Sequence, residues 1–222
     1  MTVPYSDFSS SSRVHAASNI YESVGKRCLD LILVLIAAPV AVPLVALILL
    51  ATWREGGRPL YVQHRIGRGG KQFRCWKVRT MVQNADRVLA ELIVSDPVVA
   101  QEWHHNQKLT DDPRITRLGR FLRRTSLDEL PQLWNVINGT MSLIGPRPFT
   151  PDQRALYAGG HHAAYYNYRP GLSGLWQVSR RSAGSFAERV AYDEQYCRNV
   201  SFLGDAAILW QTLFVVARAT GI

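Results

Sequence analysis

The sequence predicts a mostly helical α+β fold, in which an N-terminal membrane-inserted helix hairpin precedes a small cytoplasmic domain. Residues 31–51 carry no charged or strongly polar side chain. Two strand-like stretches flank a glycine-rich turn, which predicts a short β-hairpin, and several later segments have the spacing of amphipathic helices, which we place at the membrane interface. We therefore expect a flexible tail (1–19), a membrane-inserted re-entrant helix (20–53) and a membrane-associated cytoplasmic domain (54–222).

The apolar run is long enough for a full membrane crossing, because a helix of that length reaches about 30 Å. Its flanks favour a different topology. Lys26 and Arg27 precede the run and Arg54 follows it, and basic residues on both sides keep both ends in the cytoplasm. Pro39 and Pro43 lie inside the run, where each releases a backbone hydrogen bond and bends the helix. We favour a helix that enters one leaflet and leaves by the same face.

The composition indicates an anionic partner. The formal net charge is +9 at pH 7, and nucleic acid, anionic lipid headgroups and phosphorylated substrates all fit that charge. The three cysteines, Cys28, Cys75 and Cys197, are scattered and form no C-x-x-C pair. This argues against a disulfide framework or a zinc site and is typical of a reducing cytoplasm.

The segment after the apolar run is strongly basic. Residues 61–62 and 73–78 have strand-like composition, with three glycines between them as the turn. We expect most of the charge to bind lipid headgroups, at about 1 kcal/mol per basic residue. One acid, Glu55, accompanies these basic residues: Arg54, Arg58, Arg65, Arg68, Lys71, Arg74, Lys77 and Arg79.

The middle of the chain reads as helix and turn. Residues 84–110 are expected to be helical with a break at Asp96-Pro97. Residues 111–113 are expected to form a turn that caps the next helix, with metal binding by their two aspartates as the alternative. A further helix is expected at 186–198. The last apolar segment, 206–217, is too short to span a membrane and either lies at the interface or packs on the core.

Aromatic and histidine clusters leave alternatives open. The tyrosines in residues 165–168 form either a stacking surface for a base or sugar, or ordinary aromatic packing. The histidine pairs 104–105 and 161–162 are adjacent, so they lack the i,i+4 spacing that lets two imidazoles share a helix face. We interpret all four histidines as surface residues.

A basic helix leads into a pair of acids. Its arginines recur at helical spacing, opposite an apolar stripe. Asp128 and Glu129 follow, and Arg147 stands between Pro146 and Pro148, which restrict its backbone. Such a helix face is either simply solvated or part of a phosphate site, since guanidiniums around carboxylates suit phosphate. The arginines of the helix are Arg114, Arg117, Arg120, Arg123 and Arg124.

Ser126 and Glu129 have the spacing of a capping box. Pro131 conflicts with a helix that starts there, whereas a start one or two residues later places Pro131 in the first turn, where its missing N–H needs no partner. Asp128 and Glu129 then lie at the positive helix end, which favours their ionised forms by about 0.3–1 kcal/mol. A charged carboxylate suits a nucleophile or a metal ligand. We expect the helix to end at Asn138-Gly139.

Several motifs in order resemble one protein family. Arg123-x-Thr-Ser-Leu-Asp-Glu-Leu-Pro-Gln-Leu133 and Met141-Ser-Leu-Ile-Gly-Pro-Arg-Pro148 are similar to the bacterial sugar transferases, the monotopic phosphoglycosyl transferases that load a sugar phosphate onto polyprenyl phosphate. The similarity covers nearly everything after the first twenty residues. It extends to Lys26-Arg27-x-x-Asp30, Lys77-x-Arg79-Thr80-Met81, Arg169-Pro-Gly-Leu172 and Gly174-Leu-Trp-Gln-Val178.

The resemblance implies a reaction and a location. Such an enzyme transfers a sugar 1-phosphate, here galactose or glucose, from a UDP-sugar to undecaprenyl phosphate and releases UMP. This is the first membrane step of exopolysaccharide synthesis, on the cytoplasmic face of the inner membrane. Relatives use a re-entrant hairpin with Ser before the turn proline. This chain departs from them with Ala38-Pro39.

The resemblance also implies residue roles. Asp128 is the expected nucleophile, forming a phosphosugar-aspartate intermediate, and the expected ligand of a Mg²⁺ ion. Glu129 would orient groups beside it or help to bind the metal. The expected phosphate- and nucleotide-binding residues are Arg147, Arg123, Lys77 and Arg79.

Two other classes of function compete with the transferase. A basic membrane-anchored module would bind anionic lipid or nucleic acid, with the two acids as helix caps only. An interaction subunit of a polysaccharide-assembly complex would have lost its chemistry. For the transferase we expect a UDP-sugar, undecaprenyl phosphate and membrane lipids as partners and no nucleic acid, with a homo-oligomer compatible.

Overall fold

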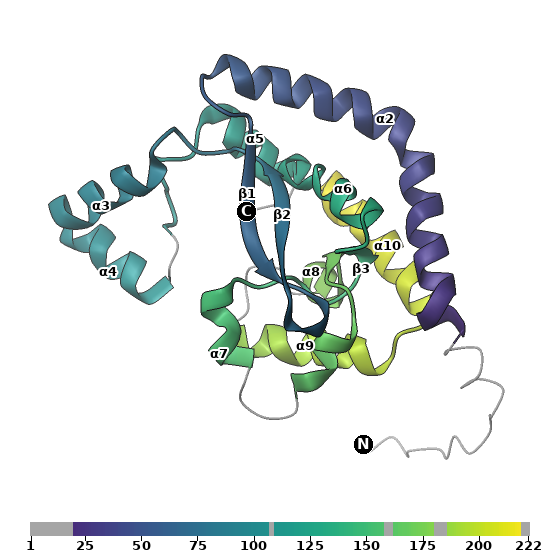
Figure 1. The fold of residues 1–222 in the computed structure, drawn as a ribbon. Helices are drawn as coiled ribbons and strands as arrows, with labels where there is room; N and C mark the ends of the chain where they lie inside the picture. The colour runs from purple at the N-terminus through teal and green to yellow at the C-terminus, as the bar shows by residue number, and fades with distance from the viewer. Residues whose placement is uncertain (1–19, 107–108, 158–161, 180–185, 219–222) are drawn as a thin grey trace.

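The computed structural model describes residues 20–106, 109–157, 162–179 and 186–218; the expected tail, residues 1–19, lies outside them. The described part is mostly helical, with a β-hairpin at its centre (Figure 1). Its strands are β1 (Leu60–Ile66), β2 (Gln72–Val78), β3 (Ser142–Ile144) and β4 (Gly171–Ser173). Its α-helices are α2 (Lys26–Arg54), α3 (Ala85–Ser95), α4 (Pro97–Asn106), α5 (Arg117–Thr125), α6 (Gln132–Ile137), α7 (Arg154–Tyr157), α8 (Leu175–Ser179), α9 (Phe186–Arg198) and α10 (Phe202–Ala217).

Helix α2 is one long apolar helix that bends along its length, with its two halves running in different directions (Figure 1). Pro39 and Pro43 lie inside it and account for the bend, because each removes a backbone hydrogen bond. Much of its apolar surface is exposed; Leu35 is 74% and Val40 73% exposed. The helix is long and apolar enough to cross a membrane. A single bent helix therefore stands where the sequence predicts a hairpin.

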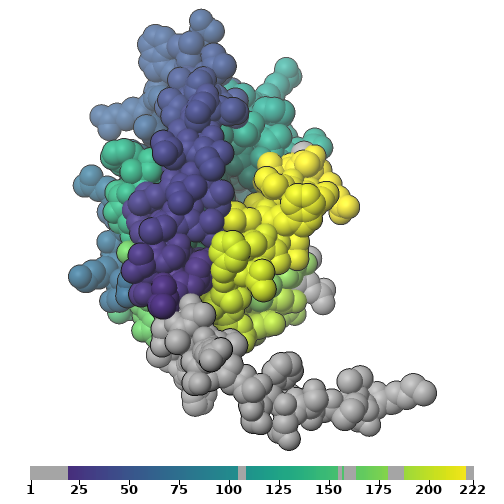
Figure 2. Space-filling model, turned by 90° about the vertical axis from the view of Figure 1, so that its right-hand side faces the viewer, coloured from purple at the N-terminus to yellow at the C-terminus, as the bar shows by residue number. Residues whose placement is uncertain are grey.

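The N-terminal end of α2 is bound to the domain by three polar side chains. Lys26 forms an ion pair with the buried Asp205 of α10, and Figure 2 shows α2 and α10 side by side. Arg27 donates to two carbonyls at the end of α6. Asp30 accepts from the Ser142 hydroxyl at 3.0 Å and from the next backbone N–H of β3. The Lys-Arg-x-x-Asp motif is thus the joint between helix and domain.

The C-terminal end of α2 meets the same domain. Arg79 Nη2 donates to the Thr52 carbonyl at 3.0 Å. Ile48 is buried in one cluster with Val78 of β2 and Leu122 of α5. Both ends of the bent helix therefore contact one body.

The predicted hairpin is confirmed. Strands β1 and β2 pair antiparallel, with Tyr61 opposite Lys77 and Arg65 opposite Phe73. Gly69 and Gly70 adopt positive φ in the turn, as glycine readily does. Side chains alternate across a strand, so Arg65 and Lys77 share one face of the hairpin.

Two motifs that lie far apart in the sequence meet as strands. Strand β3 pairs parallel with β4, with Ser142 opposite Gly171. The two backbones then cross closely at glycines. A Cβ added to Gly171 would lie 2.2 Å from the Gly145 nitrogen, and a Cβ added to Gly174 would lie 2.1 Å from the Gly145 carbonyl oxygen. This crossing leads directly into the Pro146-Arg147-Pro148 segment.

The helix predictions are largely confirmed. Helices α3 and α4 break at Asp96-Pro97, and α9 covers the predicted 186–198 range. The cap predicted at 111–113 is wrong. Thr116 caps α5, accepting from the Gly119 amide, because Asp112 instead forms a 2.6 Å ion pair with Arg114.

The aromatic residues mostly form core. Phe149, Tyr157 and Tyr165 pack together in one buried cluster, and the Tyr165 hydroxyl donates to the Ile66 carbonyl. Tyr165 is therefore a packing residue. Helix α10 is buried on one side and exposed on the other: Ile208 is buried against Ile144, while Trp210 is 62% exposed.

Candidate active site

The two acids lie on a tight turn between α5 and α6. Ser126 adopts a left-handed backbone conformation and starts the 3₁₀ turn Leu127–Glu129. Its side chain makes no capping hydrogen bond, so the capping-box interpretation is wrong. The predicted helix start just after Ser126 is only a 3₁₀ turn; α6 itself begins at Gln132, and Pro131 is its N-cap residue instead of part of its first turn. The missing N–H of Pro131 breaks no helical hydrogen bond there. The predicted end at Asn138-Gly139 is confirmed.

Glu129 is held by two cations from different elements. Lys77 Nζ of β2 lies 2.7 Å from Glu129 Oε1, and Arg147 Nη2 lies 3.5 Å from the same oxygen. Burial alone would raise the pKa of Glu129, but Lys77 and Arg147 hold this pKa at about 2. Glu129 is therefore ionised throughout the physiological range and fixes the positions of both cations.

Asp128 is buried and differs from its neighbour. Its exposed fraction is 8%, and among the described residues no side chain donates a hydrogen bond to its carboxylate. Burial raises the pKa of Asp128 to about 6, against the opposing effects of Lys77 and Arg123. The expectation that a helix end favours its ionised form is wrong in direction, because Asp128 sits on a 3₁₀ turn where burial dominates.

The backbone of Arg147 is clamped by helix α9. Its N–H donates to Asp193 Oδ1 at 3.1 Å, and its carbonyl accepts from the Arg189 guanidinium. Asp193 is 2% exposed and also accepts from the Tyr157 hydroxyl. Two side chains one turn apart on α9 therefore set the direction in which Arg147 points.

Three site residues escape the sequence analysis: Arg65, Arg189 and Asp193. Arg65 was assigned to lipid headgroups, yet its guanidinium donates to the Pro148 carbonyl at 3.1 Å. Burial, and then the nearby Arg147, lower the pKa of Arg65 to about 10. Strand alternation from Lys77 across the hairpin was a usable signal for Arg65. No local pattern marks the two α9 residues.

The remaining two predicted residues, Arg123 and Arg79, lie in different surroundings. Arg123 Nε donates to the Thr80 hydroxyl at 2.9 Å and lies close enough to Asp128 to oppose its raised pKa. Arg79 contacts the end of α2 instead of the acids. The structure thus gathers Lys77, Glu129 and Arg123 around Asp128, places Arg147 on Glu129, and assigns Arg79 to the membrane helix.

The site fits a magnesium ion held mainly by substrate. Within the described ranges no three His, Cys, Asp or Glu side chains group together as metal ligands. Mg²⁺ commonly uses one or two carboxylates together with substrate phosphates and water. Lys77 and Arg147 both contact Oε1 of Glu129, whereas no side chain among the described residues donates to Asp128, so Asp128 is the first candidate ligand.

The comparison with known proteins decides the family. Residues 21–219 match the bacterial sugar transferase family. The chain belongs to this family. Because the match includes every motif quoted above, the resemblance is confirmed, and the chain is a member of a family of transferase enzymes.

Individual relatives extend this assignment. The chain is 45% identical over 196 residues to a UDP-galactose-lipid carrier transferase of Erwinia amylovora, covering 88% of this chain and 41% of that protein. It is 44% identical over 199 residues to the exopolysaccharide production protein ExoY of Sinorhizobium fredii, covering 89% and 88%. It is 44% identical over 197 residues to an undecaprenyl-phosphate galactose phosphotransferase of Salmonella typhimurium, covering 88% and 41%. The chain thus spans about two fifths of two of these sugar transferases.

Proposed function

We propose that the chain transfers a sugar 1-phosphate from a UDP-sugar to undecaprenyl phosphate and releases UMP, as the first membrane step of exopolysaccharide synthesis. The observation that carries the proposal is Asp128, a buried carboxylate without a side-chain partner among the described residues, beside cations that are oriented by Glu129. A carboxylate without a side-chain hydrogen-bond donor keeps lone pairs available for attack.

The proposed reaction has two displacements at one phosphorus. An Asp128 oxygen attacks the β-phosphorus of the donor, the bond from this phosphorus to the bridging oxygen breaks, and UMP leaves with the electron pair. An oxygen of undecaprenyl phosphate then attacks the same phosphorus and the aspartyl bond breaks. The lipid-linked diphosphate sugar forms and the Asp128 carboxylate is restored.

The neighbouring residues have electrostatic roles in this scheme. Arg147 and Lys77 bind donor phosphate oxygens, since guanidinium and ammonium groups form charge-assisted hydrogen bonds with phosphate. Glu129 holds both cations in place. A Mg²⁺ ion on Asp128, when bound, would neutralise charge on the diphosphate.

The sugar is proposed from relatives alone. The Erwinia and Salmonella proteins carry galactose in their names, so UDP-galactose is our first candidate donor and UDP-glucose the second. No residue of the described site distinguishes these epimers.

We further propose that α2 is re-entrant and that the domain lies on the cytoplasmic face. Both ends of the helix are bound to the same domain, and basic residues flank both ends. The bend near Pro39 would then be the deepest point in the membrane.

The test is replacement of Asp128 by Asn in the full chain reconstituted in nanodiscs. UMP release with undecaprenyl phosphate is measured against a panel of UDP-sugars. We expect a loss of about 10³-fold or more, because the nucleophile is removed. Asp152→Asn, an exposed acid outside the site, is the control and should retain full activity.

Intact-mass measurement with donor alone should show a sugar-phosphate adduct on the unmodified chain and none on the variant. Full UMP release by Asp128→Asn would rule out the proposed nucleophile. A basic binding module, in contrast, would release no UMP and would bind anionic lipid equally well with either residue.

A further inference from the structure

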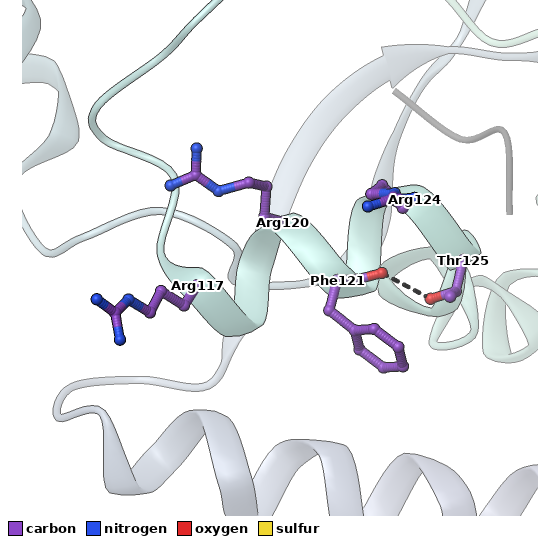
Figure 3. Close-up of a pocket in the computed structure, with 5 residues that line it drawn as sticks. All are labelled: Arg117, Arg120, Phe121, Arg124 and Thr125. Carbon is purple, nitrogen blue, oxygen red and sulfur yellow. Dashed lines mark hydrogen bonds between the residues drawn. The ribbon is translucent and has the colours of Figure 1, made fainter.

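The outer face of α5 carries a cationic cavity that none of the roles above uses. The cavity has a volume of about 480 Å³ and is lined by Arg117, Arg120, Phe121, Arg124 and Thr125 (Figure 3). The Phe121 ring is 56% exposed. Phe121 and Arg120 leave the helix in opposite directions in Figure 3, so the cavity combines an apolar side with a charged side.

The charge of this face is almost uncompensated. Within the described residues, Asp111 is the one acid at ion-pair distance from the cavity arginines, 3.5 Å from Arg120, and its side chain is 92% exposed. An exposed pair of this kind contributes little. Three guanidiniums within about two turns of helix therefore favour an anion that carries more than one charge.

The cavity lies next to the membrane helix. Leu118 and Leu122, on the neighbouring face of α5, pack in one cluster with Ile48 of α2. Ile48 precedes Arg54, the last residue of α2, by six residues, or about 9 Å of helix. An anion in the cavity would therefore sit near the polar end of the membrane helix, which the proposed re-entrant topology places at the depth of lipid headgroups.

One residue of the cavity lining is close to the nucleophile. Thr125 lines it and precedes Asp128 by three residues, so their Cα atoms are at most about 11 Å apart. Arg123 does not line the cavity; its guanidinium bonds to Thr80 and contributes to the surroundings of Asp128. Helix α5 thus directs Arg123 towards Asp128, while its other three arginines line the cavity on the outer face.

We propose that this face of α5 docks the acceptor, with Arg117, Arg120 and Arg124 around its phosphate monoester and Phe121 against its first isoprene units. This inference rests on the proposed function. A phosphate monoester carries up to two charges at neutral pH, whereas a phospholipid diester carries one. The UDP-sugar has no apolar chain that would use an exposed phenylalanine.

The kinetic test uses the double variant Arg120→Gln/Arg124→Gln in nanodiscs. We expect the KM for undecaprenyl phosphate to rise about tenfold or more, while the KM for the UDP-sugar stays within about twofold, because charge-assisted bonds to the acceptor alone are lost. Arg87→Gln on α3, an exposed arginine paired within its own helix, is the control. An unchanged acceptor KM in the double variant would overturn the proposal.

A binding test separates the sources of phosphate and does not need turnover. Native mass spectrometry measures lipid retained by the chain from nanodiscs of neutral phosphatidylcholine doped with undecaprenyl phosphate or with phosphatidylglycerol. The double variant should lose undecaprenyl phosphate selectively. Equal loss of both lipids would make α5 a general anionic surface and refute acceptor docking. If the unmodified chain releases no UMP from any donor, the proposed function fails, while lipid retention still decides this inference.

Discussion

Asp128 and Glu129 are neighbours with opposite ionisation behaviour, because cations contact only one of them. Lys77 and Arg147 stabilise the Glu129 carboxylate directly, whereas Asp128 is buried without such a contact. The sequence indicates the pair of acids and the cations around them, but its helix-end position predicts the same ionisation for both acids. A helix-dipole argument depends on local position alone, and it cannot include burial created by strands and helices elsewhere in the chain.

The difference predicts a pH profile. Burial places the pKa of Asp128 at about 6, and only its ionised form can attack, so the donor step should slow about tenfold per pH unit below pH 6. The burst of UMP release without acceptor, measured from about pH 5 to pH 8, reports this step. A profile that stays flat down to pH 5 would contradict the assigned pKa.

The same groups predict opposite effects on stability. Because the pKa of Asp128 is raised to about 6, its ionised form destabilises the fold above pH 6. This cost decreases as the pH falls from 6 towards 3.8, the pKa of the unfolded chain, and is absent below that pH. Glu129, whose pKa is lowered to about 2, stabilises the fold above its unfolded value near 4.5 and loses this effect as the pH falls towards 2. Asp128→Asn should therefore melt at a higher temperature than the unmodified chain at neutral pH.

At the scale of elements, sequence patterns predict the features that depend on local residues and do not predict the contacts between distant elements. The glycines after Ile66 predicted the hairpin, and Gly139 predicted the end of α6, since a positive φ is a property of the residue itself. The clamp on Arg147 comes from α9, 42 and 46 residues along the chain. Nothing in the spacing within α9 indicates that contact, because packing of separate elements determines it.

The crossing of β3 and β4 predicts a contrast between two glycines. Gly171→Ala would force a Cβ to 2.2 Å from the Gly145 nitrogen, so we expect a loss of more than about 3 kcal/mol of stability or failure to fold. Gly69→Ala has the same added atom and a φ of +68°, but nothing lies within 4 Å of it. It should cost only about 1 kcal/mol.

Thermal unfolding in detergent measures both variants against the unmodified chain. Equal melting temperatures for the two alanine variants would mean that β3 and β4 do not approach as closely as described.

At the scale of the whole molecule, the bent helix predicts a membrane topology. If α2 is re-entrant, residues before Lys26 and after Arg54 lie on the same side. Ser23→Cys and Glu55→Cys, each in a chain whose native cysteines are replaced by Ser, should react with an impermeant maleimide in inside-out vesicles and not in right-side-out vesicles.

The native Cys28 is exposed, which makes the cysteine-free background necessary. Labelling of the two positions from opposite sides would establish a spanning helix and remove the re-entrant proposal, although the reaction at Asp128 would still be open to test.

The joint at Lys26, Arg27 and Asp30 has a practical consequence for anyone preparing this protein. Deleting helix α2 to make a water-soluble fragment would also delete the counter-ion of Asp205 and the hydrogen-bond partners of Ser142 and of the end of α6. Unpaired buried polar groups of this kind cost several kcal/mol in total. Such a fragment should precipitate or unfold. The intact chain should therefore be purified in detergent or lipid at every stage.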